Sequence, residues 1–301
     1  MLTITAGLVL CLAAIGGCAS AAQPAPEIPQ FDGKRAFEHL LKIVEIGPRP
    51  AGSPGAARTR EYITAQLKAL GLTVQEQAFE AHTPIGPIRT INLRATIAGA
   101  DGSNGPRLVI AGHYDTKLFK EFAFVGANDG GSSTAFLIEL ARVLKDARLP
   151  RPIELVFFDG EEAVIDWNQG NDNTYGSRHY VAEARRDGSL KDIRAMILID
   201  MVADRDLRIM RDTNSTPWLT DIFWSAARRL GHSHFVDEAM DIKDDHIPFL
   251  QAGVPAVDLI DLDYPAWHTE ADTVDKVSEK SMQVVGDVLL AGLPDVMARI
   301  R

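Results

Sequence analysis

The sequence predicts an α/β fold in which a mostly parallel or mixed central sheet carries helices on both faces. Short runs of Val, Ile, Leu and Phe, such as Leu108–Ala111 and Ile153–Phe158, lack polar alternation and are typical of strands buried on both faces. These runs alternate along the chain with amphipathic helical segments, which is the order of a parallel sheet with helical crossovers. Hydrophobic residues make up 46% of the 301 residues and charged residues 24%, enough apolar material for one large core.

The first predicted elements are two helices, separated by the Gly/Pro-rich stretch Gly47–Gly55. The first helix is amphipathic over Ala36–Ile46, and the second covers Ala56–Leu70 and ends at Gly71. Two strands follow, and then strands and helices alternate to the C-terminus. The predicted strands are Thr73–Phe79, Ile91–Ala98, Leu108–Ala111, Ile153–Phe158, Ala195–Ile199 and Val254–Ile260, and the later helices are Ser132–Lys145, Ser177–Arg186, Pro217–Leu230 and Ser278–Met297.

The first 30 residues are typical of an export signal followed by a tether. Residues 2–17 are apolar or small, a run too short to span a bilayer comfortably but suited to the apolar region of a signal peptide. Ile15-Gly16-Gly17-Cys18 resembles the bacterial lipoprotein cleavage box, which implies cleavage before Cys18 and a lipid on it. We therefore expect a lipoprotein-type signal peptide at 1–17, a Pro/Ala-rich tether at 18–30 and the folded domain at 31–301, on the extracytoplasmic side. The alternative is an ordinary signal peptide, cleaved a few residues later in the Ala-rich stretch before Gln23, and a secreted protein.

Charge and cysteine content exclude several classes of partner and site. The formal net charge is -10, and residues 1–26 carry none of it, so a nucleic-acid partner is not expected. We expect a monomer that meets the membrane only through the lipid anchor. Cys11 and Cys18 are the only cysteines, so the folded domain has no thiol for a disulfide or for a metal. Any metal site must use His and carboxylate side chains.

Polar residues gather where the predicted strands end, and in open α/β sheets sites form beyond the carboxyl ends of the strands. Their oxygen and nitrogen donors are those that zinc accepts. Taken singly, each has a simpler explanation: a lone His is usually a satisfied core or surface residue, and an Asp before a helix is often its N-cap. Their joint order is harder to obtain by accident. The set is His113, Asp115, Asp129, Asp159, Glu161, Glu162, Asp200 and His268.

From about Phe37 to the C-terminus, this series resembles the zinc aminopeptidases of the M28 type, which implies their phosphorylase/hydrolase-like fold. Within that superfamily the chain is most similar to the animal-type glutaminyl-peptide cyclotransferases. The similarity rests on three segments: Glu161–Trp167 followed by Tyr175–His179, Asp244–Leu250, and Trp267-His268-Thr269.

The chain also departs from that group in three places. A cysteine pair near the His113 strand is absent, and Asn128-Asp129-Gly130 is closer to the peptidases. The loop Tyr264-Pro265-Ala266-Trp267 is one residue shorter than usual and carries Tyr in place of Phe. These departures bear on the shape of the substrate pocket.

The resemblance implies a role for each site residue. Asp129, Glu162 and His268 would bind one zinc ion and leave its fourth position open. Glu161 would be the general acid/base, and Asp244, in a relay with Asp200, would hold the leaving amide. The pocket walls would be Trp167, Trp267 and Tyr264. His113 and Asp115 would support the ligands, with a second zinc ion on His113 and Asp200 as the alternative.

The implied activity of the domain at 31–301 is zinc-dependent conversion of N-terminal glutamine in peptides or proteins to pyroglutamate, with release of ammonia. The alternative is an M28-type aminopeptidase, in which Glu161 activates a water held by two zinc ions. A binding protein on an inactive peptidase fold is disfavoured, because Glu161 and every ligand are present. The ligand set leaves one zinc ion or two open.

Overall fold

The computed structural model describes residues 2–3, 29–100, 102 and 105–300. Its strands are β1 (Val74–Thr83), β2 (Gly86–Ile97), β3 (Arg107–His113), β4 (Ile153–Phe158), β5 (Ile193–Asp200), β6 (Ile209–Asp212), β7 (Phe235–Met240) and β8 (Ala256–Ile260). Its helices are α1 (Gly33–Ile46), α2 (Pro54–Ala69), α3 (Gly131–Leu144), α4 (Tyr175–Arg186), α5 (Pro217–Leu230), α6 (Ile247–Gln251) and α7 (Glu279–Arg299), with 3₁₀ turns at Ser189–Asp192 and Val274–Lys276. Cys18 and nearly all of the predicted signal peptide and tether lie outside the described residues.

Six of the strands form one mixed sheet in the order β1-β2-β4-β3-β5-β8. The β1–β2 and β2–β4 pairs are antiparallel, whereas β4, β3, β5 and β8 run parallel to one another. Every residue of β3, β4 and β8 is buried, as expected for strands covered on both faces. The predicted α/β class with a mostly parallel or mixed sheet is confirmed.

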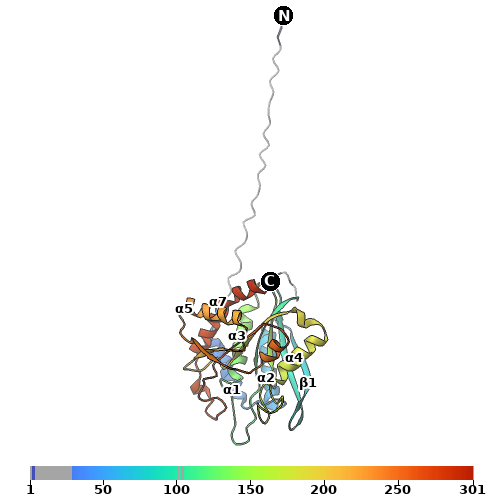
Figure 1. Ribbon diagram of the computed structural model, residues 1–301, viewed down its shortest axis with the longest axis vertical. Coiled ribbons are helices and arrows are strands. Elements are labelled where there is room, and N and C mark those ends of the chain that lie inside the picture. The colour runs from blue at the N-terminus through green and yellow to red at the C-terminus, as the bar shows by residue number, and fades with distance from the viewer. Residues whose placement is uncertain (1, 4–28, 101, 103–104, 301) are drawn as a thin grey trace.

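Helices cover both faces of this sheet (Figure 1). On one face, α1, α2, α3, α5 and α7 contribute to the largest hydrophobic cluster, in which Phe136 of α3 joins Ile110 of β3. On the other face, α4 and α6 bring Tyr180 and Phe249 to Val109, the neighbour of Ile110 on the same strand. Alternate side chains of β3 therefore enter opposite cores, which is why its sequence shows no polar alternation.

Two strands and a short helix were not predicted. β6 and β7 pair in parallel as a separate two-stranded sheet, and α6 follows β7 directly. β7 carries Asp237 and Glu238 on an exposed stretch, so it lacks the apolar pattern that marks the central strands. The β1–β2 hairpin is also longer than predicted, because most side chains in its paired outer half are partly or fully exposed and lack a continuous apolar run.

The closing helix α7 is long and apolar enough to qualify as a membrane span by length and composition alone. Its most apolar window is 61% buried inside the fold, as in the core helix of a globular domain. It packs on α1 and α5, and its Gly286 lies against Phe31 at the start of the described domain. We therefore assign α7 to the core.

Candidate active site and metal centre

The predicted polar residues converge at the carboxyl ends of the parallel strands. His113 is the last residue of β3 and Asp200 the last residue of β5. Asp129 lies in the turn before α3, Glu161 and Glu162 follow β4, and His268 lies in the loop after β8. This is the edge at which ligands bind in open α/β sheets, and the strand directions bring together residues up to 155 positions apart, from His113 to His268.

Asp129, Glu162 and His268 form one group whose potential ligand atoms all lie within 4.8 Å of one another. His268 Nε2 is 3.1 Å from Glu162 Oε1 and 3.3 Å from Asp129 Oδ2. Two carboxylates and one imidazole are a donor set that zinc uses in catalytic sites. The structure therefore brings together the three residues predicted as ligands.

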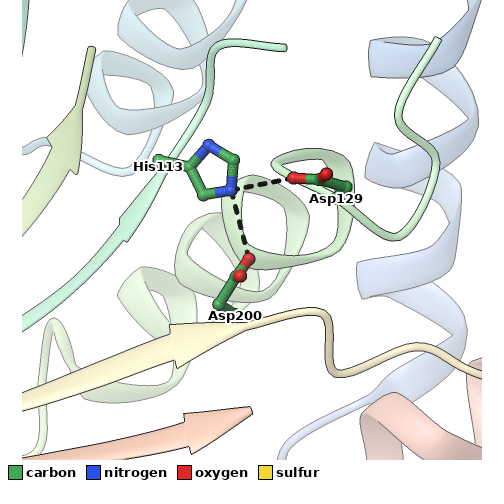
Figure 2. Close-up of side chains that lie close together, drawn as sticks. All are labelled: His113, Asp129 and Asp200. Atoms are coloured by element: carbon green, nitrogen blue, oxygen red, sulfur yellow. Dashed lines mark ion pairs between the residues drawn. The ribbon is translucent and has the colours of Figure 1, made fainter. Parts of the chain in front are cut away.

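A second group of the same kind adjoins the first. His113 Nε2 lies 3.2 Å from Asp129 Oδ1 and 3.2 Å from Asp200 Oδ1, as Figure 2 shows. Asp129 thus belongs to both groups, with Oδ1 directed at His113 and Oδ2 at His268. This shared carboxylate would be able to bridge two metal ions.

Both groups have the electrostatics of a cation site. His113 Nε2, Asp129 Oδ2 and Glu162 Oε2 are buried without a hydrogen-bond partner, which is unfavourable unless something else binds them. Burial lowers the pKa of His268, but its contacts with Asp129 and Glu162 raise it to about 10. Burial also lowers the pKa of His113. The charges of Asp200 and Glu161 outweigh this effect and raise that pKa well above its ordinary value. The negative charge that raises these pKa values would also attract Zn²⁺, which takes the place of a proton on the imidazole nitrogen, so the residues fit the metal.

Two further carboxylates hold the ligand loops in place. Asp115 accepts the backbone N–H groups of Glu161 at 3.1 Å and Glu162 at 3.3 Å. Asp272 accepts the backbone N–H groups of Asn128 at 2.8 Å and Asp129 at 3.1 Å. Outer partners of this kind orient ligands and commonly decide metal affinity. Asp115 therefore has the supporting position expected for it, whereas Asp272 was not predicted.

Tyr264, expected on the pocket wall, lies elsewhere. The side chain is only 4% exposed and packs with Met201, Ile242 and Ile260. Its hydroxyl donates a 2.8 Å hydrogen bond to Asp272, the residue that braces the Asp129 loop. A buried phenol needs a hydrogen-bond partner, and Asp272 provides it, so Tyr264 supports the Asp129 loop and is not among the residues that line the pocket.

Arg49 is the most unusual supporting residue, and it was not predicted as part of the site. It is fully buried and donates to the backbone carbonyls of Tyr114 at 2.7 Å, Gly126 at 2.7 Å and Asp129 at 3.1 Å. A further bond reaches Val125, so one guanidinium ties the segment after β3 to the turn before α3. The clue in the sequence was the surrounding Gly/Pro-rich stretch, whose Gly55 leaves no room for a Cβ against the Pro48 carbonyl.

Glu161 lies beside the metal groups without belonging to either of them. Its Oε2 is 3.9 Å from His113 Nδ1, and its neighbour Glu162 provides the ligand atom instead. Burial raises the pKa of Glu161 well above its usual range; the charge of His113 opposes this rise, and repulsion from Asp244 and Glu162 adds to it. A carboxyl group with a raised pKa next to a metal site is suited to move protons.

A pocket of about 470 Å³ opens over these groups. Its floor includes Glu161, Glu162, Asp200 and Asp244, and its walls include both predicted tryptophans, Trp167 and Trp267. Trp267 is 42% exposed and stacks on His268, with ring centroids 4.3 Å apart. The volume suits the end of a peptide chain, and the mixture of acids and aromatic rings suits a cationic amine with an amide.

The predicted relay between Asp244 and Asp200 has no direct hydrogen bond in the part of the chain that the structure describes. Asp200 instead accepts the Met201 N–H at 2.8 Å and contacts His113. Burial raises the pKa of Asp200 to about 7, with His113 opposing the shift and Asp244 adding to it. Burial raises the pKa of Asp244 as well. The two carboxyl groups therefore influence one another through their charge.

Backbone strain marks the same site. His268 has a φ of 54° and Met201, directly after Asp200, a φ of 43°; both are in the left-handed region that side chains with a Cβ avoid. Such conformations persist where the surroundings enforce them, and they collect at functional sites. At His268 the conformation directs the imidazole toward Asp129 and Glu162.

Comparisons with known proteins agree with this geometry. Residues 92–293 match Peptidase family M28. The chain is 31% identical to the glutaminyl-peptide cyclotransferase-like protein of Bos taurus, over 82% of this chain and 71% of that protein. It is 32% identical to the glutaminyl-peptide cyclotransferase of Drosophila melanogaster, over 78% of this chain and 73% of that protein.

A solved structure adds the fold. The glutaminyl cyclase of an Acidobacteriales bacterium superposes with a TM-score of 0.85 at 38% sequence identity, covering 93% of this chain and all of the other. The similarity extends well beyond the motifs, into the helices that carry no site residue. The chain therefore belongs to peptidase family M28 and, within it, to the glutaminyl-peptide cyclotransferases.

Proposed function

We propose that this protein converts the N-terminal glutamine of peptides or proteins to pyroglutamate and releases ammonia. The observation that carries this proposal is the pocket itself. Glu161, an acid outside the proposed ligand set, lines the same pocket as the metal group Asp129, Glu162 and His268. Asp244, Trp167 and Trp267 line this pocket as well. That arrangement suits a reaction in which one residue must fold its side chain back on its own amine.

We expect one zinc ion per chain, which Asp129, Glu162 and His268 would hold. When bound there, zinc supplies Lewis-acid polarisation of the substrate's side-chain carbonyl. The surrounding side chains transfer the proton and orient the substrate. A second ion on His113 and Asp200 is the alternative, supported by the second group of converging atoms.

Glu161 moves the proton that the reaction must transfer. The α-amine forms a bond to the side-chain carbonyl carbon, and Glu161 accepts the proton that this nitrogen loses. As the original carbon–nitrogen bond breaks, Glu161 delivers the proton to the leaving nitrogen, which departs as ammonia. Asp244 accepts an N–H of the leaving amide, while Trp167 and Trp267 restrict the side chain to its folded form. Such orientation can supply several kcal/mol of the barrier, up to about 7–11 in favourable cases.

The test compares a Gln-initiated with a Leu-initiated peptide, each incubated with zinc-loaded protein and analysed by mass spectrometry. We expect the first to lose one ammonia and keep all its residues, and the second to remain unchanged. Trp267→Ala and Asp244→Ala should depress the reaction while bound zinc stays nearly constant, since neither side chain is a proposed ligand. Release of free glutamine or leucine without a pyroglutamyl product would contradict the proposal.

An aminopeptidase is the second candidate, and one observation favours it. The His113–Asp129–Asp200 group adjoins the first and shares Asp129 with it, as a two-metal hydrolase would require. Glu161 would then activate a water in place of the peptide's own amine. The same pair of peptides separates the two candidates, because hydrolysis shortens the chain and cyclisation does not.

We further propose that the protein is an exported lipoprotein anchored through Cys18, as supported by Ile15-Gly16-Gly17-Cys18 and the Pro/Ala-rich stretch after it. Cys18→Ser should release the protein from the membrane fraction, because the residue that would carry the lipid has been removed. Fractionation and immunoblotting of both forms would measure this. If parent and variant are equally soluble and equally cleaved, the protein is exported without a lipid.

A further inference from the structure

A buried imidazole lies behind the pocket, and the proposed reaction does not use it. His246 is completely buried at the N-terminus of α6, two residues after Asp244. Its Nε2 is 3.0 Å from Asp212 Oδ2, at the end of β6, and its Nδ1 is 3.5 Å from Asp258 Oδ2, on β8. The imidazole is therefore held between carboxyl groups of two different sheets, and solvent does not reach it.

The two carboxyl groups differ in how well they are otherwise satisfied. Asp212 accepts backbone N–H groups from Ser215 at 2.7 Å, Asn214 at 3.0 Å and Ile242 at 3.2 Å. Asp258 receives no hydrogen bond on either side-chain oxygen from the described residues. A buried carboxyl group without partners is strongly unfavourable, so Asp258 depends on the imidazole beside it. His246 Nδ1 and Nε2 likewise have no hydrogen-bond partner among the described residues, so the imidazole contacts Asp212 and Asp258 as a neighbour in charge, at 3.0 and 3.5 Å.

The residue between Asp244 and His246 is tied down independently. The Ser177 hydroxyl of α4 donates to Asp245 Oδ1, and the backbone N–H of Asp245 donates to the Asp244 carboxyl group. The backbone N–H of Ile247 donates a 2.9 Å hydrogen bond to the Asp244 carbonyl. The segment Asp244-Asp245-His246 is thus attached to α4, β6 and β8. Of its three side chains, that of Asp244 lines the pocket.

The charge of His246 also acts on the neighbouring carboxyl groups. Burial raises the pKa of Asp244, and His246 is the strongest of the influences that oppose this rise. Burial, and then repulsion from Asp244 and Asp212, raises the pKa of Asp258 well above its ordinary value. Replacing the imidazole by an apolar group would leave three neighbouring carboxyl groups with less compensation, and the loop that carries Asp244 would be pushed from its place.

We propose that His246 is a positioning residue for cyclisation: held by Asp212 and Asp258, it fixes the backbone that carries Asp244 and so sets where the Asp244 carboxyl group meets the substrate amide. This inference rests on the function proposed above, in which Asp244 holds that amide. His246 itself touches neither the pocket nor the two metal groups.

The test is a double-mutant cycle between His246 and Asp244, measured as kcat and KM on a Gln-initiated peptide. His246→Leu should lower kcat by about 10²-fold, the scale of a misplaced catalytic group, with zinc content unchanged. His246→Gln, whose side-chain amide is able to donate a hydrogen bond to Asp212, should recover part of this loss. In an Asp244→Asn background, His246→Leu should cause less than about a twofold further loss, because its effect passes through Asp244.

A matched control removes a different imidazole, one that is partly buried on α1, a helix that carries no site residue. His39 of α1 is bonded to the Tyr62 hydroxyl at 2.7 Å, and His39→Leu should leave kcat unchanged. The positioning role is overturned if His246→Leu retains full kcat or loses zinc. It is also overturned if His246→Leu lowers kcat by the same factor in the Asp244→Asn background as in the wild type. Should His246→Leu not fold, His246→Gln carries the same cycle. Failure of the proposed function itself shows separately, as absence of a pyroglutamyl product from the wild-type protein.

Discussion

Glu161→Gln is expected to keep its zinc and to lower turnover by about 10²–10⁴-fold, the usual scale for a general acid/base. The amide is nearly isosteric with the carboxyl group but cannot take the proton from the attacking amine. Glu161 stands outside both ligand groups, so the metal should remain. Zinc content by elemental analysis and kcat on a Gln-initiated peptide measure the two effects separately.

Glu162→Gln is the matched comparison, one residue away and identical in chemistry. Glu162 Oε1 is 3.1 Å from His268 Nε2 and belongs to the first ligand group, so this variant should lose zinc together with activity. Asp115 holds the backbone of both residues, so neither change disturbs the other's anchoring. Zinc loss in both variants, or full turnover in Glu161→Gln, would remove Glu161 from its proposed role.

The central sheet could be predicted from sequence because burial on both faces leaves a simple pattern. Leu108–Ala111 and Ile153–Phe158 are continuous apolar runs, and the strands found there are buried throughout. β7 could not be predicted in this way, since an exposed strand with Asp237 and Glu238 resembles a loop. Polar residues at the ends of the buried strands then indicated where the site lies.

The supporting residues were harder to predict, because their roles depend on partners that only the fold brings near. Arg49 acts through backbone carbonyls, which have no sequence signature, at positions 65–80 residues away. Asp212 and Asp258 belong to no motif in the sequence. They become neighbours only in the fold, where β6 and β8 bring them to either side of His246. Tyr264 was predicted on the pocket wall by resemblance, whereas in the structure its hydroxyl donates to the buried Asp272.

Asp129 belongs to both candidate metal groups, so replacing it should lower zinc binding and activity more than replacing any other ligand. One of its carboxylate oxygens faces His268 and the other faces His113. Asp129→Asn should therefore abolish zinc binding whichever group holds the metal, and kcat/KM should fall by at least about 10³-fold, which corresponds to several kcal/mol of lost Lewis-acid stabilisation. Zinc titration of the metal-free protein and the peptide assay measure both losses.

His113→Asn is the control that separates one ion from two, because His113 belongs only to the second group. With one zinc ion on Asp129, Glu162 and His268, the wild type should bind one equivalent and His113→Asn should bind the same number. If the wild type binds two and His113→Asn only one, the second group is a true metal site, and the one-zinc proposal is wrong. If Asp129→Asn retains zinc at the wild-type affinity, neither group holds the metal as proposed, because both need that carboxylate.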